Sequence, residues 1–466
     1  MEKKLSRVAN TFTPSPIQEL SHLAQRCNAI NLAEGFPDFP AAPAIKSAAV
    51  SAINSDFNQY RHVQGICELL ARNAKEMYGL EVDPDTDIAI CCGQTEAFAA
   101  AMFAIIDPGD EVVLFDPCYE TYEGCIQLAG GIPVYVALEP PHWTLDAEKF
   151  MSSFTGRTKA VILNRFIHCV VFFWNVVFMN LLTVEWHSPQ NPTGKVFTWN
   201  ELEIIAEACR SRDCLAVTDE VYEHITYDNV KHVTLSLLPG MQQRTIITSS
   251  VSKTFGVTGW RIGWAIANPI LASAIRNIHV KLTDSAPAPF QEAALTALSS
   301  GPDYFESLRR DYESKRDYSI QLLTGIGFQI RFKPQGSFFL FAELPESSPL
   351  SDVGASLALT DPKTKVAFLT LIIPCLLVLM VQVEYVKHLI EQAGVVAVPG
   401  RGFFHFNSVS SESEESLSAC HDYQKRYIRF AFCKSSATLE AAAQGLSVLV
   451  DTKGCLNLPP PSKTDT

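Results

Sequence analysis

The sequence predicts an α/β protein in which a large domain with a mostly parallel sheet is joined to a smaller α+β domain. Strand-like apolar runs alternate with helical patterns between residues 88 and 218, and this alternation is typical of a parallel sheet covered on both faces. After residue 300 the pattern changes to a charged helix followed by apolar runs. The chain has 466 residues, and one hydrophobic core stops growing near about 250–300 residues. We therefore expect two domains.

The large domain is predicted element by element from its apolar runs and its turn residues. Residues 88–91 form a short β-like run, and Gly93 then opens an Ala-rich helical pattern that ends at the turn formed by residues 107–110. The elements predicted after this turn are strands at 111–115, 133–137, 159–163 and 214–218 and helices at 122–129 and 200–210. Ligands of such sheets gather at the carboxyl ends of the strands, so we expect the site there.

The predicted small domain contains a helix at 304–323, a segment at 328–332 and an apolar run at 337–341. We expect residues 38–300 to form the large domain and residues 301–450 the small one. Residues 1–37 are expected to join the small domain, and the Pro-rich end, 451–466, is expected to be disordered.

Composition excludes several classes of protein. The chain is 47% hydrophobic and 19% charged, which suits a globular protein, and its net charge of −13 argues against nucleic acid as a partner. The 13 cysteines are an odd number without a CxxC pair, which favours free thiols over disulfides or a metal site. The N-terminus has no apolar signal region, so we expect a cytoplasmic protein, with a mitochondrial or chloroplast location still open.

Polar segments follow the predicted strands at 93–95, 191–194, 219–222 and 250–261. Singly each is a weak signal, because an Asp that closes a strand is often only a helix cap. Their order is more informative. Lys253 lies among serines, Arg261 follows eight residues later, and Asp219 with Tyr222 lies about thirty residues upstream. Residues of these types in this order are what the binding of a phosphorylated pyridine aldehyde would require.

The chain resembles the fold type I, pyridoxal-phosphate-dependent aminotransferases of class I/II, and within them the kynurenine–oxoglutarate and glutamine-type transaminases. The resemblance is carried in family order by residues 31–40, Tyr60, 93–97, 117–119, 188–194, 219–222, 250–261 and 427–430. It implies a seven-stranded sheet in the large domain and pyridoxal 5′-phosphate as the cofactor.

The resemblance implies catalytic roles for Lys253, Asp219 and Tyr222. Lys253 would hold the cofactor as a Schiff base and would move the α-proton of the substrate once it is released. Asp219 would pair with the pyridine nitrogen, which makes the ring an electron sink. Tyr222 and Asn191 would donate hydrogen bonds to the 3′-oxygen of the ring, and Tyr119 would stack on the ring.

The resemblance also implies a phosphate site built from fixed donors. Backbone N–H groups at a helix N-terminus, two hydroxyls and a guanidinium would contribute, from Gly93, Gln94, Thr95, Ser250, Ser252 and Arg261. Tyr60 of the partner subunit would reach the same phosphate, which implies a homodimer with shared active sites.

For the substrate, the resemblance implies that Arg429 binds the carboxylate, with contributions from Gly35 and Asn191. Phe36, Phe338 and Phe339 favour large or aromatic side chains, and no residue clearly supplies a second cation for a dicarboxylate. We therefore expect transamination of kynurenine, glutamine, phenylalanine or methionine with a 2-oxo acid such as 2-oxoglutarate. A cysteine-S-conjugate β-lyase and a non-catalytic isoform are the alternatives.

Two apolar segments, 165–187 and 353–382, interrupt the family pattern. Both are long enough to be considered as membrane spans, but the first would split the sheet and Pro374 breaks the second. A lid or partner surface is a further interpretation. We favour a third hypothesis, translated intron or gene-model segments, because the family pattern resumes cleanly on either side. We therefore expect no membrane association.

Overall fold

The computed structural model describes residues 4–6, 9–10, 16–61, 64–164, 189–228, 230, 234–344, 383, 385–405, 424 and 426–450. Both atypical segments, 165–187 and 353–382, and the predicted tail lie outside these residues. The chain forms two compact units. Unit 1 comprises Met1–Phe12, Phe39–Glu313 and Pro334–Ser337, and unit 2 comprises Thr13–Asp38, Ser314–Lys333 and Phe338–Thr466.

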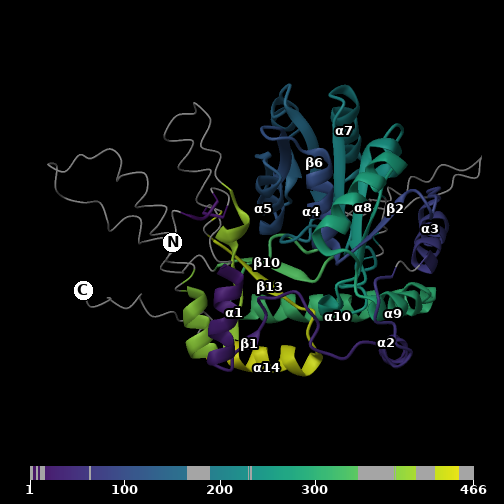
Figure 1. Ribbon diagram of the computed structural model, residues 1–466. Helices are drawn as coiled ribbons and strands as arrows, with labels where there is room; N and C mark the ends of the chain where they lie inside the picture. The colour runs from purple at the N-terminus through teal and green to yellow at the C-terminus, as the bar shows by residue number, and fades with distance from the viewer. Residues whose placement is uncertain are drawn as a thin grey trace, which may run out of the picture. The chain divides into compact units, whose positions relative to one another are not determined.

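Unit 1 is built on one large sheet with helices on both faces (Figure 1). Its strands lie in the order β2 (Ile88–Cys91), β9 (Gly263–Ile266), β8 (Thr245–Ser250), β7 (Leu215–Asp219), β6 (Thr158–Asn164), β3 (Glu111–Asp116), β4 (Ile132–Glu139) and β5 (Thr144–Leu145). The strands from β8 to β4 run parallel, whereas β9 and β5 are antiparallel to their neighbours. The predicted α/β class is confirmed.

The expected number of strands is wrong, because the sheet has eight strands within the described part of the chain. The extra strand is β5, a two-residue strand that pairs with the end of β4. A strand this short has no alternation of apolar and polar residues, so no sequence pattern announces it. Strands β8 and β9 are also absent from the element-by-element prediction.

Helices cover both faces of the sheet, and β3 and β8 are buried at every position. On one face, α4 (Gln94–Ile105), α5 (Glu120–Leu128) and α8 (Pro269–Thr283) pack on residues such as Val112, Ile162 and Val217. On the other face, the Phe115 ring lies 5.4 Å from Phe150 of α6 (Ala147–Ser152) and 5.1 Å from Phe197, which precedes α7 (Trp199–Ser211). This arrangement leaves the strand ends to carry polar groups.

A third group of helices covers the end of the sheet formed by β2 and β9. It consists of α2 (Pro43–Asn54), α3 (Gln64–Tyr78) and α9 (Ala288–Leu298). Apolar residues from these helices pack with Ile88, Ile90 and Trp264 of the two strands. The helix α10 (Pro302–Gly325) begins in unit 1 and continues into unit 2.

Unit 2 is a smaller α+β unit with two small sheets. β10 (Phe339–Glu343), β13 (Tyr427–Ala431) and β12 (Val398–Pro399) form an antiparallel sheet, and β1 (Ile30–Asn31) pairs in parallel with β11 (Val395–Val396). Besides the second half of α10, the described part of this unit includes α1 (Pro16–Arg26), the π-helical turn η6 (Leu389–Ala393), the 3-10 turn η7 (Gly400–Phe403) and α14 (Ser436–Ser447). Tyr427 stacks on Phe341 at 4.6 Å in its core.

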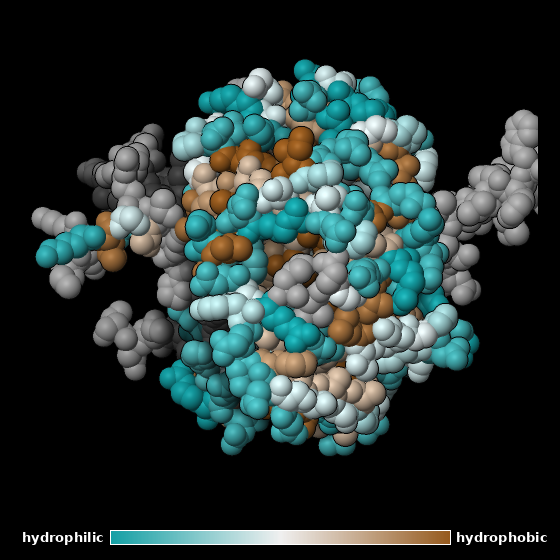
Figure 2. Space-filling view, turned by 45° about the vertical axis from the view of Figure 1, so that its right-hand side comes forward, coloured by the Kyte–Doolittle hydropathy of each residue, from teal (hydrophilic) through white to brown (hydrophobic). Residues whose placement is uncertain are grey.

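The part of the chain that the structure describes contains no helix long and apolar enough to cross a membrane. On the face displayed in Figure 2, hydrophobic residues lie in small patches separated by hydrophilic ones. The described cysteines are free thiols, and Cys91 is buried.

Candidate functional site

Polar residues of unit 1 meet at the carboxyl ends of three neighbouring strands. Asp219, the last residue of β7, pairs with the backbone of Asn164 in β6 and with Thr248 in β8. Because β9 runs antiparallel, Gly263 lies opposite both Ser250 and Cys91. The sheet therefore brings the ends of β7 and β8 close to the loop that opens α4.

Asp219 is a buried carboxylate with defined partners. The Tyr122 hydroxyl donates to its Oδ2 at 2.7 Å, and the Val221 N–H donates to its Oδ1 at 3.3 Å. Burial raises the pKa of Asp219 to about 6, and the two hydrogen bonds and the positive charge of Lys253 oppose this shift. At neutral pH the carboxylate is ionised, and it is close enough to Lys253 to feel its charge.

The other predicted ring-binding residues lie in unit 1 as well. Asn191 and Tyr222 are buried, whereas Lys253 and Tyr119 are half-buried. The Tyr119 ring packs edge-on against Tyr122, with 5.8 Å between ring centroids, so it is linked through Tyr122 to Asp219.

The loop that carries Asn191 is fixed on both sides of that residue. Gln190 donates its side-chain amide to the Pro117 carbonyl at 2.7 Å and accepts a hydrogen bond from the Thr193 hydroxyl at 2.8 Å. Lys195 then forms a buried ion pair with Glu201 at 3.0 Å. Ser188, which belongs to the same predicted motif, lies outside the described residues.

The N-terminus of α4 has the properties of an anion-binding site. Gly93 adopts φ +82°, and among the described residues no side chain caps the helix, so its first N–H groups are not used for capping. The Arg261 guanidinium packs directly on Gly93, since a Cβ there would lie 2.3 Å from Nη2. Gln94 is held by a 3.2 Å hydrogen bond from its side chain to Thr248. Thr95 is exposed.

Two serine hydroxyls lie at the end of β8. Ser250 Oγ accepts the Ser252 N–H at 3.3 Å, and Ser252 Oγ is buried without a hydrogen-bond partner among the described residues. A buried hydroxyl without a partner, a guanidinium and an uncapped helix N-terminus are the donors that a phosphate needs. These residues therefore fit the phosphate of pyridoxal 5′-phosphate.

Tyr60 lies on the surface of unit 1. It is 81% exposed on unit 1 and shares a surface cavity of about 280 Å³ with residues that include Arg276, His279 and Ser285. No hydrogen bond of the described residues joins it to the strand ends.

The two residues predicted only for the substrate lie in unit 2. Arg429 is buried in β13 and donates from Nη2 to the Ala33 carbonyl at 2.8 Å. Its guanidinium carbon lies 4.2 Å from the Phe339 ring centre and 4.6 Å from that of Phe403, which holds it between two aromatic faces. At Gly35 a Cβ would come within 2.5 Å of the Phe339 ring, so only glycine fits.

The segment around Gly35 is tied to the same strand by a second cation. Lys434, just after β13, donates to the Glu34 carbonyl at 3.2 Å and to the Phe36 carbonyl at 2.7 Å. Its ammonium also lies 4.1 Å from the Phe36 ring centre. Burial lowers the pKa of Lys434. The Lys434 ammonium therefore makes its contacts inside unit 2.

Sequence reasoning missed Tyr122, Thr248, Phe403 and Lys434. Tyr122 carries a readable signal, because it follows Tyr119 by three residues and lies in the first turn of the helix that Tyr119 precedes. The other three reach their partners across strands or from distant segments, and their spacing gives no sign of this.

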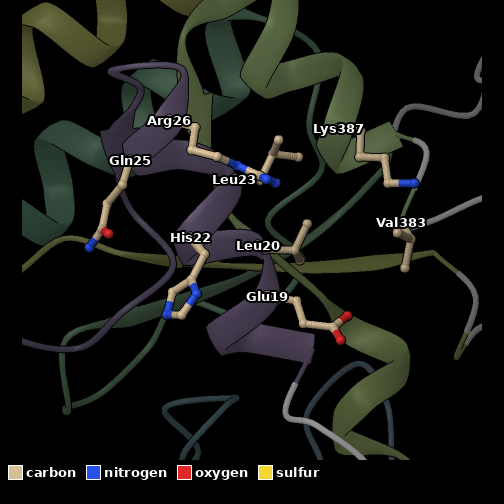
Figure 3. A pocket seen from close by; sticks show the side chains of 8 residues that line it. All are labelled: Glu19, Leu20, His22, Leu23, Gln25, Arg26, Val383 and Lys387. Carbon is tan, nitrogen blue, oxygen red and sulfur yellow. The ribbon is translucent and has the colours of Figure 1, made fainter.

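A cavity of about 750 Å³ lies in unit 2 between α1 and the segment that holds Val383 and Lys387. Leu20 and Leu23 line this cavity from the side of α1 that faces Val383 and Lys387. His22 and Gln25 point away from Lys387 (Figure 3). None of the predicted site residues lines this cavity, so it is not a candidate for the cofactor.

The large sheet with helices on both faces, the buried carboxylate near a lysine and the open N-terminus of α4 are typical of an α/β enzyme with its site at the strand ends. The chain belongs to the aminotransferase class I and II family, whose model matches residues 28–446. The predicted family and enzyme class are confirmed.

Relatives cover nearly the whole chain. A kynurenine–oxoglutarate transaminase from Dictyostelium discoideum is 31% identical, over 95% of this chain and 96% of that protein. A methionine aminotransferase from Escherichia coli is 29% identical, over 96% and 98%. The solved structure of N-succinyldiaminopimelate aminotransferase from Mycobacterium tuberculosis superposes with a TM-score of 0.77 at 31% identity, over 95% and 99%. The relatives thus share a reaction type and differ in substrate.

Proposed function

We propose that this protein uses pyridoxal 5′-phosphate to transfer the amino group of an aromatic or large neutral amino acid to a 2-oxo acid such as 2-oxoglutarate. The observation that carries the proposal is the placement of buried Asp219, with Lys253 acting on its charge, at the sheet edge where Arg261 packs on the N-terminus of α4. When bound, the cofactor supplies an electron sink for the charge that develops at the α-carbon of the amino acid.

Asp219 would hold a proton at the pyridine nitrogen. Its carboxylate is ionised near neutral pH, and Tyr122 fixes the oxygen that does not face the Val221 N–H. An ionised carboxylate in a buried site favours a cationic partner strongly. This contact would keep the ring protonated.

Lys253 would take the α-proton from the substrate and return a proton at the end of the transfer. The position of Lys253, half-buried and close enough to Asp219 for their charges to interact, supports this assignment. Asn191 and Tyr222, both buried, would hold the ring by hydrogen bonds to its 3′-oxygen.

Binding of the phosphate would be the task of Gly93, Gln94, Thr95, Ser250, Ser252 and Arg261. Their backbone N–H groups, hydroxyls and guanidinium are the donors described at the end of β8 and the start of α4. Tyr60 of the partner subunit would add a hydroxyl in a homodimer, and the exposure of Tyr60 supports this.

Arg429 would bind the substrate carboxylate. The aromatic residues around it and around Gly35 are Phe338, Phe339 and Phe403, which favours amino acids with large or aromatic side chains. Two of the relatives are named for kynurenine and for methionine, which agrees with this preference.

The test is an absorption spectrum of the purified full-length protein before and after kynurenine or methionine is added with 2-oxoglutarate. We expect a visible or near-ultraviolet band from lysine-bound cofactor, bleaching by the amino donor, and formation of glutamate. Lys253→Ala should abolish both the band and turnover. A full-length protein that is folded but neither binds pyridoxal 5′-phosphate nor transfers the amino group would favour a non-catalytic isoform.

A further inference from the structure

The N-terminus of α4 is held in place by a half-buried acid, Glu96, that no predicted role includes. We propose that Glu96, fixed by His279 and Thr283, positions the first N–H groups of α4 and so sets the affinity of the protein for the cofactor's phosphate. This inference rests on the proposed function, and it concerns a positioning residue rather than a catalytic one.

Glu96 is the third residue of α4, and its side chain turns back toward the loop that precedes the helix. One carboxylate oxygen accepts a short hydrogen bond from the Cys92 N–H, one residue before Gly93. The bond spans Gly93, the residue on which the Arg261 guanidinium packs. Glu96 thereby fixes the loop without using the N–H groups of Gln94 or Thr95.

A second helix holds the carboxylate of Glu96. His279 of α8 is 7% exposed, and its Nδ1 lies 2.8 Å and 3.0 Å from the two carboxylate oxygens. The Thr283 hydroxyl, one turn further along α8, donates to Glu96 at 3.0 Å. The start of α4 is therefore tied to the last turns of α8.

The hydrogen bonds keep Glu96 charged. Burial by itself would raise its pKa, but the bonds from His279, from the Cys92 N–H and from Thr283 lower the pKa below its usual value. A carboxylate in the first turn also interacts favourably with the helix dipole.

The same position in α7 shows what is distinctive about α4. There Glu201 accepts the Thr198 N–H, and the Thr198 side chain accepts the Glu201 N–H, so the helix start is closed by its own residues. In α4 the N-cap is Gly93, which has no side chain to close the helix. Glu96 thus gives α4 a fixed loop together with an open N-terminus, and an anion can use that N-terminus.

The experiment measures dissociation constants for two probes that differ only in the phosphate. Full-length protein freed of cofactor is titrated with pyridoxal 5′-phosphate and with pyridoxal, and absorbance reports binding. We expect Glu96→Ala to weaken binding of pyridoxal 5′-phosphate about 10-fold or more while pyridoxal changes less than about 2-fold. A residue needed only for folding would weaken both probes alike.

Asp146→Ala is the matched control. Asp146 also caps a helix of unit 1 with its carboxylate, accepting the N–H groups of Glu148 and Lys149, but it lies at α6. Its removal should leave both dissociation constants unchanged. Glu96→Gln, which retains an acceptor for the Cys92 N–H, should recover most of the lost affinity.

His279→Ala provides a second variant in case Glu96→Ala does not fold, and it should weaken the phosphate-bearing probe in the same selective way. Equal losses for both probes, or no loss in either variant, would overturn the positioning role. Failure of the unmodified protein to bind pyridoxal 5′-phosphate would instead overturn the proposed function, so the two outcomes are distinguishable.

Discussion

The buried carboxylate of Asp219 lowers the free energy of unfolding of the protein at neutral pH. Its pKa of about 6 exceeds the usual 3.8, so the folded protein still binds the proton at pH values where the unfolded chain has lost it. Stability contributed by this group is therefore present below about pH 4 and is lost as the pH rises to about 6. Above that pH the folded chain carries the full cost of a buried carboxylate.

We predict that Asp219→Asn stabilises the cofactor-free protein by roughly 1–3 kcal/mol at pH 7 while it lowers turnover strongly. An asparagine keeps an oxygen for the Tyr122 hydroxyl and removes the buried charge. Denaturant unfolding at pH 7 and at pH 4 checks the sign, since the gain should vanish at the lower pH. Equal stability of both proteins at pH 7 would contradict the argument.

Arg429 has a shape that lysine cannot replace. Its planar guanidinium lies between Phe339 and Phe403 and holds the Ala33 carbonyl. We predict that Arg429→Lys raises the KM for the amino acid by about 10- to 100-fold and leaves cofactor absorbance unchanged. Steady-state kinetics checks this.

Arg426→Lys is the matched control for Arg429, because Arg426 precedes the same strand and its Nη2 donates to a backbone carbonyl, that of Leu344, at 2.8 Å. It should change the KM by less than about 2-fold. A similar rise in both variants would mean that Arg429 acts through stability of the strand.

At the scale of elements, β9 and α4 meet through two glycines. A Cβ at Gly263 would lie 2.4 Å from the carbonyl carbon of Gly93 and 2.5 Å from the nitrogen of Gln94, both backbone atoms that cannot rotate away. We predict that Gly263→Ala costs about 1–3 kcal/mol of stability and weakens binding of pyridoxal 5′-phosphate, because the start of α4 must move.

Thermal unfolding and a cofactor titration test this prediction. Gly156→Ala is the control, since nothing lies within 4 Å of its Cβ position, and it should shift stability by less than about 0.5 kcal/mol. A Gly263→Ala protein with normal stability and affinity would show that the strand and the helix adjust without cost.

Three central strands of the large sheet were predictable from the sequence. The runs at 111–115, 159–163 and 214–218 coincide with β3, β6 and β7 to within one residue at each end, because buried parallel strands are continuous apolar runs. The antiparallel placement of β9 was not predictable, since hydrophobic pattern does not encode strand direction. It matters because β9 carries Gly263 to the start of α4.

At the scale of the whole molecule, the described flanks of segment 165–187 lie at neighbouring strand ends. The backbone of Asn164, the last residue of β6, pairs with Asp219. On the other side Gln190 bonds to Pro117, just beyond the end of β3, and β3 pairs with β6. A short connection can therefore join Asn164 to Pro189.

We predict that a protein lacking 165–187 and 353–382 folds, binds pyridoxal 5′-phosphate and is at least as soluble as the full chain, because the removed residues are largely apolar. Absorption spectra and thermal unfolding of both versions check this. If only the trimmed protein binds the cofactor, the insertions disable this chain. If the trimmed protein aggregates, the segments are integral to the fold.

The sequence by itself determined the family and part of the order of strands and helices, and it predicted the residues proposed for the chemistry, because these features depend on local spacing around Lys253, Asp219 and Arg429. Only the tertiary structure decided the surroundings of those residues. Tyr122 on Asp219, Phe403 on Arg429 and His279 on Glu96 are contacts between distant segments. Burial and hydrogen bonding there set charge and position, and both depend on how the chain packs.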